Sequence, residues 1–493
     1  MDLKLATIIL LSVYAMAMLL LVYRGAQKTK TLKDYALGQG FPSIIVAFSL
    51  AAGISSAATF IINPGFVAFY GWSAFLAMSI VLPLGLFLSL ILLSKSFRKH
   101  GHFSSALTLP QWAGNRFDSQ LLSRLLAVFS LLLITFLVLL CVGLTKIISS
   151  SIGVGEVYVL IGIVVFVFGY MLFGGANSLV YTNFIQAVIM LIVSIILITS
   201  GFGYFEGGVM DYVNTLNTLD PALTQAYNPA SPLFRDWFEV IFCNFIVGIA
   251  IVCQPHIITK SLMLKSEKSV NAYLVYAVIV LIVFFSVLLA GFYCRMMFPD
   301  LMFQGKPLPL DGIMSTYVVE RFSTGAGVLV IFGLLAAGMS TLESLIQSLS
   351  ITITQDLVRP ILGKRADNMD LNKVNRKVII GLAVITALVS YNQLISPNLS
   401  VGILAQNGVY AFFSSAFIPV LFGIFVKDAS KSSVIASSIV AIVVHFSVYY
   451  LGLTPYTTGE VRNPAVASAI AIMSSLMTGI IFLMVDRKKK LSI

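Results

Sequence analysis

Charged residues are scarce in this chain. Asp, Glu, Lys and Arg make up 10% of its 493 residues, whereas 58% are hydrophobic; soluble domains carry about 25% charged residues. The period-two alternation of apolar and polar residues that a membrane β-barrel requires is absent as well. The composition therefore excludes an ordinary soluble domain and predicts an all-α integral membrane protein.

Cysteine is also rare, and the signatures of catalysis are missing. The four cysteines (Cys141, Cys243, Cys253 and Cys294) lie in or beside apolar segments, without C-x-x-C spacing. We expect them to be buried as small apolar side chains. No metal-ligand cluster, nucleophile–base arrangement or phosphate loop stands on a water-facing segment. The sequence therefore predicts that the protein is not an enzyme.

Long apolar runs recur along the whole chain. A helix needs about 20 mostly apolar residues to cross a bilayer. Thirteen spans are expected, at residues 3–23, 41–70, 73–95, 121–149, 156–173, 178–203, 237–259, 270–296, 323–357, 376–391, 398–426, 432–452 and 464–486. Basic residues follow the first run instead of preceding it, which is the reverse of a signal peptide. We therefore expect 3–23 to be a retained helix.

Lysine and arginine gather in alternate loops. If the 24–40 loop is cytoplasmic, most of the 31 basic residues, Lys260 among them, fall on the cytoplasmic side. This predicts an N-terminus outside and a C-terminus in the cytoplasm. The net charge of +11 then reflects topology and contact with the lipid bilayer, and no nucleic-acid partner is needed. The long outer loops, 204–236 and 297–322, have room for short helices.

Two of the expected spans contain helix-breaking residues. The segment AFSLAAGISSAATFIINPG (47–65) has small residues around Gly53–Ser56 and then a Pro-Gly pair, and NFIVGIAIVCQPHIITK (244–260) has Pro255 in its middle. Breaks at corresponding places in two five-helix halves indicate inverted repeats around a binding site at the membrane midplane. Ordinary kinks are an equally open interpretation of the same residues.

Several segments carry a family resemblance. They are LKDYALGQG, AFSLAAGISSAATFIINPG, ALTLPQWAGNRF, FGGANSLVYTNFIQAV, CQPHIITK and LLAAGMSTLESLIQSLSITITQDL, in that order over about residues 32–430. Together they resemble the sodium/solute symporter family, in its bacterial proline- and pantothenate-transporting branch. The resemblance implies a LeuT-like fold and sodium-driven uptake of a small organic solute by alternating access. It also implies a multi-pass protein of the cell membrane, in the bacterial inner membrane.

The same resemblance implies the organisation of the chain. A single transmembrane domain (1–493) would consist of a leading helix (3–23), a first five-helix repeat (41–203), a second repeat (237–426), two trailing helices (432–486) and a basic cytoplasmic tail (487–493).

The family's sodium motif matches five positions of this chain. Ala52 and Ser55 would offer backbone carbonyls beside the first break; Ala337 would add a carbonyl, and Ser340 and Thr341 their hydroxyls. Positions 337, 340 and 341 lie on one face of a helix. Sodium is the coupling ion that the resemblance implies, and a proton stays open.

Glu343 departs from the family pattern. Members usually carry a small residue there and an acid at the position of Asn183. One hypothesis is a relocated carboxylate, with Glu343, Ser340, Ser344, Thr182 and Asn183 around a second cation site or an ion exit path. A second is a protonated Glu343 bonded to Asn183, which permits proton coupling. A third places Glu343 in a watery vestibule without a specific role.

Polar residues near the two breaks are the candidates for binding the solute. They are Ser56, Thr59, Asn244, Gln254, His256, Gln406, Asn407 and Tyr410. No arginine stands at the midplane to bind a carboxylate, so helix N-termini would have to serve. The proline branch has tryptophans where this chain has Ala58 and Val247, which argues against proline. The expected solute is an organic acid, a pantothenate-like compound or another amino acid, and His445 is expected to bond between helices.

Three alternatives to a sodium symporter stay open. They are a proton-coupled symporter that uses Glu343, a symporter-like sensor module, and a channel. The sequence shows no obligatory protein partner. Only a symporter concentrates its solute against a gradient.

Overall fold

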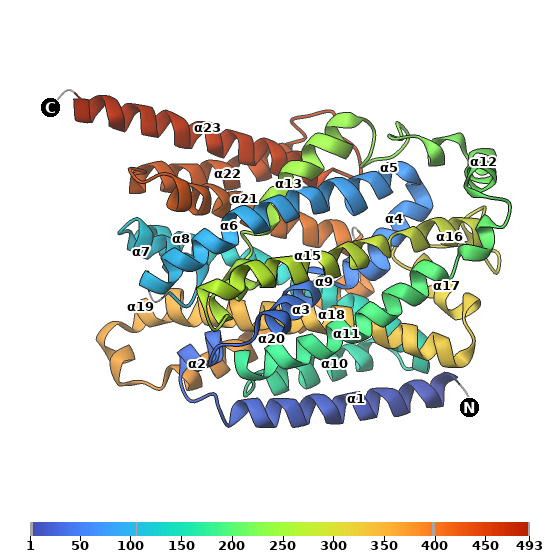
Figure 1. The fold of residues 1–493 in the computed structure, drawn as a ribbon, viewed down its shortest axis with the longest axis horizontal. Coiled ribbons are helices and arrows are strands. Elements are labelled where there is room, and N and C mark those ends of the chain that lie inside the picture. The colour runs from blue at the N-terminus through green and yellow to red at the C-terminus, as the bar shows by residue number, and fades with distance from the viewer. Residues whose placement is uncertain (1–2, 105, 397–399, 492–493) are drawn as a thin grey trace.

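A computed structural model describes residues 3–104, 106–396 and 400–491. Most helices run along the long axis of the molecule, and the two chain ends lie at opposite ends of that axis (Figure 1). Helix α1 (Leu3–Ala26) lies along one edge of this view and α23 (Pro464–Leu491) along the other. The arrangement is that of a helical bundle suited to a bilayer.

The first half of the chain contains the helices of the first expected repeat. In order they are α2 (Leu32–Leu37), α3 (Ser43–Ile54), η1 (Ala58–Ile62), α4 (Asn63–Tyr70), α5 (Trp72–Phe75), η2 (Leu76–Val81), α6 (Leu82–Ser104), α7 (Leu109–Arg116), α8 (Gln120–Ser130), η3 (Leu131–Leu133), α9 (Ile134–Ile152), α10 (Glu156–Met171) and α11 (Ala176–Thr199).

The second half repeats this alternation of long and broken helices. After η4 (Phe202–Phe205), α12 (Val209–Leu219) and η5 (Pro221–Thr224) come η6 (Phe238–Cys243), α13 (Asn244–Ile251), α14 (Pro255–Ile258), η7 (Thr259–Met263), η8 (Glu267–Ser269), α15 (Val270–Ser286), α16 (Leu289–Met297), the hairpin β1 (Met302–Phe303) and β2 (Lys306–Pro307), α17 (Ile313–Arg321), α18 (Thr324–Thr352), η9 (Ile353–Val358), α19 (Arg359–Leu362), η10 (Gly363–Asn368), α20 (Leu371–Ile395), α21 (Val401–Phe425) and α22 (Lys431–Leu451).

Every expected span coincides with helical structure. Among the described residues, ten helices are long and apolar enough to cross a membrane, and two bent pairs raise the number to 12. The segment expected at 156–173 forms α10, whose 16 residues fall short of that length. The thirteenth crossing and the orientation stay predictions. Residues 398–399 of one expected span and 492–493 of the expected tail lie outside the described residues.

Both expected breaks are real interruptions of their helices. The axis bends by 57° between Ser43–Ile54 and Ala58–Tyr70, and by 59° between Phe238–Ile251 and Pro255–Met263. At the second break Gln254 is extended (ψ 135°), which places Pro255 at the start of a new helix, where its missing N–H costs nothing. The chain leaves the helical conformation at residues 55–56 and 252–254, so these are interruptions and not kinks of a continuous helix.

A close contact between two helices fixes the second broken span. A Cβ atom added to Gly248 of α13 would stand 2.2 Å from the Leu82 carbonyl oxygen, and one added to Gly85 of α6 would stand 2.5 Å from the Phe245 carbonyl oxygen. The two backbones therefore approach as only glycine allows. This contact holds α6 against the broken helix.

The remaining expectations of the fold concern loops, cysteines and charges. The two long connections, 204–236 and 297–322, hold the short helices α12 and α17, as expected. All four cysteines are free and buried. The assignment of Lys260 to a water-exposed loop is wrong: its side chain is 1% exposed and its ammonium donates to Ser49 Oγ at 2.8 Å. A lysine that follows an apolar run usually marks the end of a membrane span. Here the residues that follow the run form η7, which is itself buried.

Candidate functional site

The first break leaves the Ala52 carbonyl without its usual helical partner. That partner would be the N–H of Ser56, which donates to the Ile54 carbonyl instead. The oxygen of Ala52 accepts hydrogen bonds from Ser340 Oγ at 2.9 Å and Thr341 Oγ1 at 3.3 Å. Unwinding of α3 thus turns a backbone oxygen toward α18.

Four of the five residues of the expected sodium site, Ala52, Ala337, Ser340 and Thr341, meet at this point, and the role expected of the Ser55 carbonyl stays a prediction. The Ser340 and Thr341 hydroxyls also contact the Ala337 carbonyl oxygen, at 3.1 and 3.3 Å. Ser55 is fully buried at the end of α3, and its hydroxyl has no protein partner. Carbonyl and hydroxyl oxygens are what a hard cation prefers, and unwound helices supply them in membrane proteins. The donor set therefore fits a sodium ion.

Glu343 lies one turn further along α18 in a dense polar cluster. Its Oε1 accepts from Tyr170 Oη (2.6 Å) and Gln186 Nε2 (2.9 Å), and its Oε2 from Thr182 Oγ1 (2.7 Å). Its side chain is 0% exposed, so the expectation of a watery vestibule is wrong. Thr182 is also 3.1 Å from the Leu179 carbonyl. Because a hydroxyl has one hydrogen, this geometry accommodates an ionised or a protonated Glu343.

Asn183 has a different partner from the one expected. Its Nδ2 donates to Ser344 Oγ at 2.9 Å, and Ser344 donates to the Ser340 carbonyl. The bond from Glu343 to Asn183 is therefore not formed. Residues 343 and 344 point to different sides of α18. The sequence alone could not show which of them faces Asn183.

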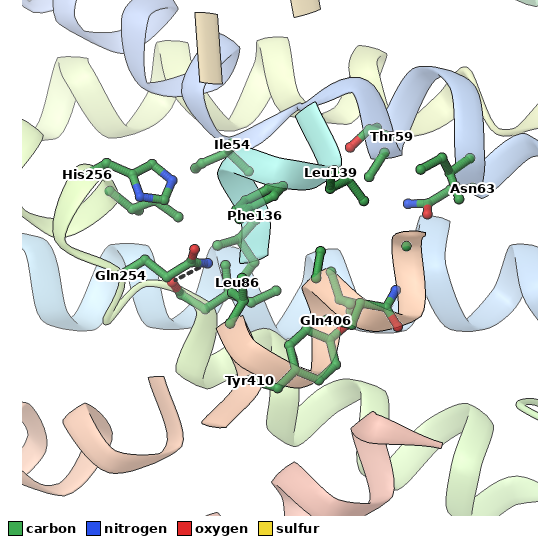
Figure 2. A pocket seen from close by; sticks show the side chains of 18 of the residues that line it. Ile54, Thr59, Asn63, Leu86, Phe136, Leu139, Gln254, His256, Gln406 and Tyr410 are labelled. Atoms are coloured by element: carbon green, nitrogen blue, oxygen red, sulfur yellow. Dashed lines mark hydrogen bonds between the residues drawn. The ribbon is translucent and has the colours of Figure 1, made fainter. Parts of the chain in front are cut away.

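A cavity lies between the two broken helices. Its volume is about 120 Å³, and α3, α4, α6, α9, α13, α14, α15 and α21 contribute to its wall. Five of the expected solute-binding residues line it: Thr59, Gln254, His256, Gln406 and Tyr410. Figure 2 shows Gln254 and His256 toward one end of the cavity and Thr59 and Asn63 toward the other, with apolar side chains between them.

Polar atoms in this cavity lack protein partners. Gln254 Oε1 and His256 Nδ1 are buried without a hydrogen bond, although Gln254 Nε2 donates to the Ile251 carbonyl at 3.3 Å. Buried polar atoms normally find partners. No Asp, Glu, Lys or Arg is among the lining residues in the described ranges. The cavity offers hydrogen bonds but no direct ion pair.

Three expected solute-binding residues do not line the cavity. Ser56 Oγ accepts from the Ala58 N–H, and Asn244 Nδ2 donates to the Glu239 carbonyl at 2.8 Å. Asn407 bonds Tyr450 and His445 of α22, which confirms the bonding between helices that was expected of His445. A polar residue in an apolar helix does not reveal which face it occupies.

Asn63 is the cavity residue that the sequence analysis missed. It stands at the junction of η1 and α4 and lines the cavity. Its signal was present, since it precedes the Pro64-Gly65 pair that was noted only as a helix breaker.

Two carboxylates outside the cavity wall tie neighbouring elements together. Ser400 Oγ donates to the Asp311 oxygens (3.1 and 3.2 Å) and caps α21 at the Gly402 N–H. Burial raises the pKa of Asp311. Asp356 accepts from Thr108 (2.6 Å) and Ser123 (3.2 Å), which joins η9 to α7 and α8.

Broken helices around a buried cavity, with carbonyls and hydroxyls converging beside it, define a membrane transport protein. The model of the sodium:solute symporter family matches residues 35–441. The chain belongs to this family, whose members are transporters and not enzymes.

Named relatives cover nearly the whole chain. It is 27% identical over 467 residues to a sodium/pantothenate symporter of Escherichia coli (strain K12), covering 90% of each chain. It is 26% identical to the osmoregulated proline transporter OpuE of Bacillus subtilis (strain 168), covering 98% of this chain and 95% of OpuE. The fold matches a substrate-bound, outward-open sodium-coupled sialic acid symporter with a TM-score of 0.78, at 20% identity over 97% and 98% of the chains. This likeness supports the LeuT-like fold.

Proposed function

We propose that the protein is a sodium-coupled secondary active symporter that imports a small organic solute by alternating access across a bacterial inner membrane. The observation that carries the proposal is the Ala52 carbonyl, which the helix break releases toward Ser340 and Thr341. Ile54, two residues later, lines the solute-sized cavity. A sodium ion bound at Ala52 would therefore hold the segment that forms the cavity wall, which couples ion binding to solute binding.

The cavity supports an elongated solute with polar groups at both ends. The unpartnered Gln254 Oε1 calls for an N–H or O–H donor on the solute, and the amide of Asn63 at the other end can serve a second polar group. Apolar side chains such as Leu86 and Phe136 favour a hydrocarbon middle. We propose a carboxylate or zwitterion, with a pantothenate-like compound as the first candidate, since one relative bears that name.

The experiment is a thermal-unfolding screen of the purified protein against organic acids, pantothenate and amino acids, in sodium and in potassium. We expect one class of solute to raise the unfolding temperature in sodium only. Equal stabilisation in potassium would contradict sodium coupling and would favour proton coupling through Glu343. Solute binding without sodium-driven uptake by liposomes would favour a sensor.

A further inference from the structure

Polar residues from both broken helices line the cavity. Thr59 and Asn63 follow the first break, whereas Gln254 and His256 stand at the second break and lie together toward one end of the cavity (Figure 2). The proposed sodium ligands lie at the end of α3 and on α18, and none of them belongs to the second broken helix. Sodium can therefore act on Gln254 and His256 only through contacts between helices.

Lys260 makes such a contact. It belongs to η7, follows His256 by about one turn of helix and is 1% exposed. Its Nζ donates to Ser49 Oγ of α3 at 2.8 Å. Ser49 is also buried, and a hydrogen bond away from water is stronger than the same bond in solvent. The bond thus joins the segment after the second break directly to the first broken helix.

The two ends of this bond lie close to the two sites. Ser49 and Ala52 are three residues apart in α3 and are neighbours on the surface of that helix. A regular helix moves as a stiff element, so a shift of Ala52 also shifts Ser49. At the other end, Lys260 is about one turn from His256, whose Nδ1 has no protein partner. The path from the sodium site to the cavity therefore consists of two helical turns and one hydrogen bond.

The backbone keeps the same two segments side by side. The Phe41 N–H, just before α3, donates to the Met263 carbonyl at 2.9 Å, and the Lys265 N–H donates to the Phe41 carbonyl at 3.2 Å. Phe41 and Leu264 thus form a short parallel bridge. The bridge holds η7 alongside the start of α3, whereas Lys260 reaches the part of α3 that leads to Ala52.

We propose that Lys260 is a positioning residue that couples the sodium site to the solute-binding residues of the second broken helix. Sodium at Ala52 fixes α3, and the bond from Lys260 to Ser49 then fixes Gln254 and His256. This inference rests on the proposed function and adds a second route of coupling to the one through Ile54. Lys260 lies outside the cavity wall, so it acts through its neighbours along the chain.

The test is hydrogen–deuterium exchange of the purified full chain in nanodiscs, with sodium as the ligand and potassium as the reference. In the wild type we expect sodium to slow exchange about fivefold or more at both breaks, residues 55–59 and 252–257, because coupled sites typically affect each other by about 5- to 150-fold. In Lys260→Met, sodium should slow exchange at the first break only.

Ser49→Ala removes the other half of the bond and should reproduce the result of Lys260→Met, so it carries the test if Lys260→Met does not fold. Lys260→Arg keeps the donor and Ser49→Thr keeps the acceptor, and both should retain the wild-type pattern. Ser261→Ala is the matched control: it removes a buried hydroxyl of η7 that bonds the Ile258 carbonyl of its own segment. It should also behave as the wild type.

Three outcomes would overturn the inference and leave the sodium site intact. They are slowing at the first break alone in the wild type, slowing at both breaks in a folded Lys260→Met or Ser49→Ala, and loss of slowing at the second break in Ser261→Ala as well. The last outcome would assign the effect to a general loosening of η7. No effect of sodium at the first break of the wild type would instead refute the proposed sodium site.

Discussion

At the scale of single residues, the oxygens around Ala52 come from two sources. Two are main-chain carbonyls, of Ala52 at the break of α3 and of Ala337 in the continuous helix α18, and two are the hydroxyls of Ser340 and Thr341. Substitution can remove the hydroxyls without touching the carbonyls. Their contribution is therefore measurable separately.

Ser340→Ala and Thr341→Ala should each weaken sodium binding about tenfold or more, because a bond to a charged group contributes about 1.5–3 kcal/mol. The measurement is the sodium concentration that gives half of the maximal rise in unfolding temperature, without solute. Ser348→Ala, about two turns further along α18, should leave that concentration unchanged. An unchanged value for both site variants would place sodium elsewhere.

Gln254→Met should weaken solute binding about tenfold and lower the stability of the solute-free protein less than Gln347→Met does, because its amide makes a single long bond, of 3.3 Å, to the Ile251 carbonyl. The substitution keeps the shape of the side chain but removes an acceptor that has no protein partner. Solute titration and thermal unfolding measure the two effects.

Gln347→Met is the matched control for this change. Gln347 is equally buried, but its amide donates to the Tyr35 and Ala36 carbonyls at 2.8 and 3.1 Å. Its loss should lower stability by about 1–3 kcal/mol. If the two variants lose the same solute affinity and the same stability, the unpartnered Oε1 of Gln254 has no special role in solute binding.

At the scale of elements, glycine lets α6 and α13 touch. Gly85→Ala and Gly248→Ala should each lower the unfolding temperature by several degrees, because the added methyl group meets a backbone carbonyl that a rotamer change cannot move. Gly162→Ala in α10 and Gly381→Ala in α20 meet nothing within 4 Å and should be tolerated. A tolerated Gly248→Ala would show that the helices separate freely.

The N-terminal end of α21 should respond to pH through Asp311. Because burial raises the pKa of this carboxyl above its ordinary value of 3.8, the folded state holds the proton more tightly than the unfolded chain. Its contribution to the unfolding free energy is therefore largest at low pH and declines as pH rises from about 4 through the folded-state pKa.

Asp311→Asn should remove that decline, as thermal unfolding between about pH 4 and about pH 7 would show. Glu320→Gln, an exposed carboxyl in the same outer connection, is the control and should keep the wild-type slope. A wild-type slope in Asp311→Asn would assign the effect to another group.

At the scale of the whole molecule, a symporter and a channel differ in what they can accumulate. In liposomes with an inward sodium gradient, the solute should rise above its outer concentration, and a sodium ionophore should abolish that rise. A channel only equalises the two concentrations. Accumulation without a sodium gradient but with a proton gradient would assign the coupling to protons.

Much of this architecture can be predicted from the sequence. Apolar runs predict where helices lie, and Pro255 and the small residues around Gly53 predict where two of them break. The direction in which a polar side chain points cannot be predicted from the sequence in the same way. Asn244 and Asn407 were expected to bind the solute, but Asn244 bonds the preceding turn of its own span and Asn407 bonds α22. Lys260 looked like a loop charge and lies in the core, because only the fold shows where the chain goes after a break.

The two halves of the proposed site also differ in how they can be inherited. The cavity wall consists of side chains, which single codon changes replace, so solute preference can drift rapidly between descendants of one gene. Two of the proposed sodium ligands, the carbonyls of Ala52 and Ala337, are main-chain oxygens, which no codon specifies directly. Single substitutions can therefore change the solute preference, whereas removal of the Ala52 carbonyl from the proposed site requires α3 to become a continuous helix.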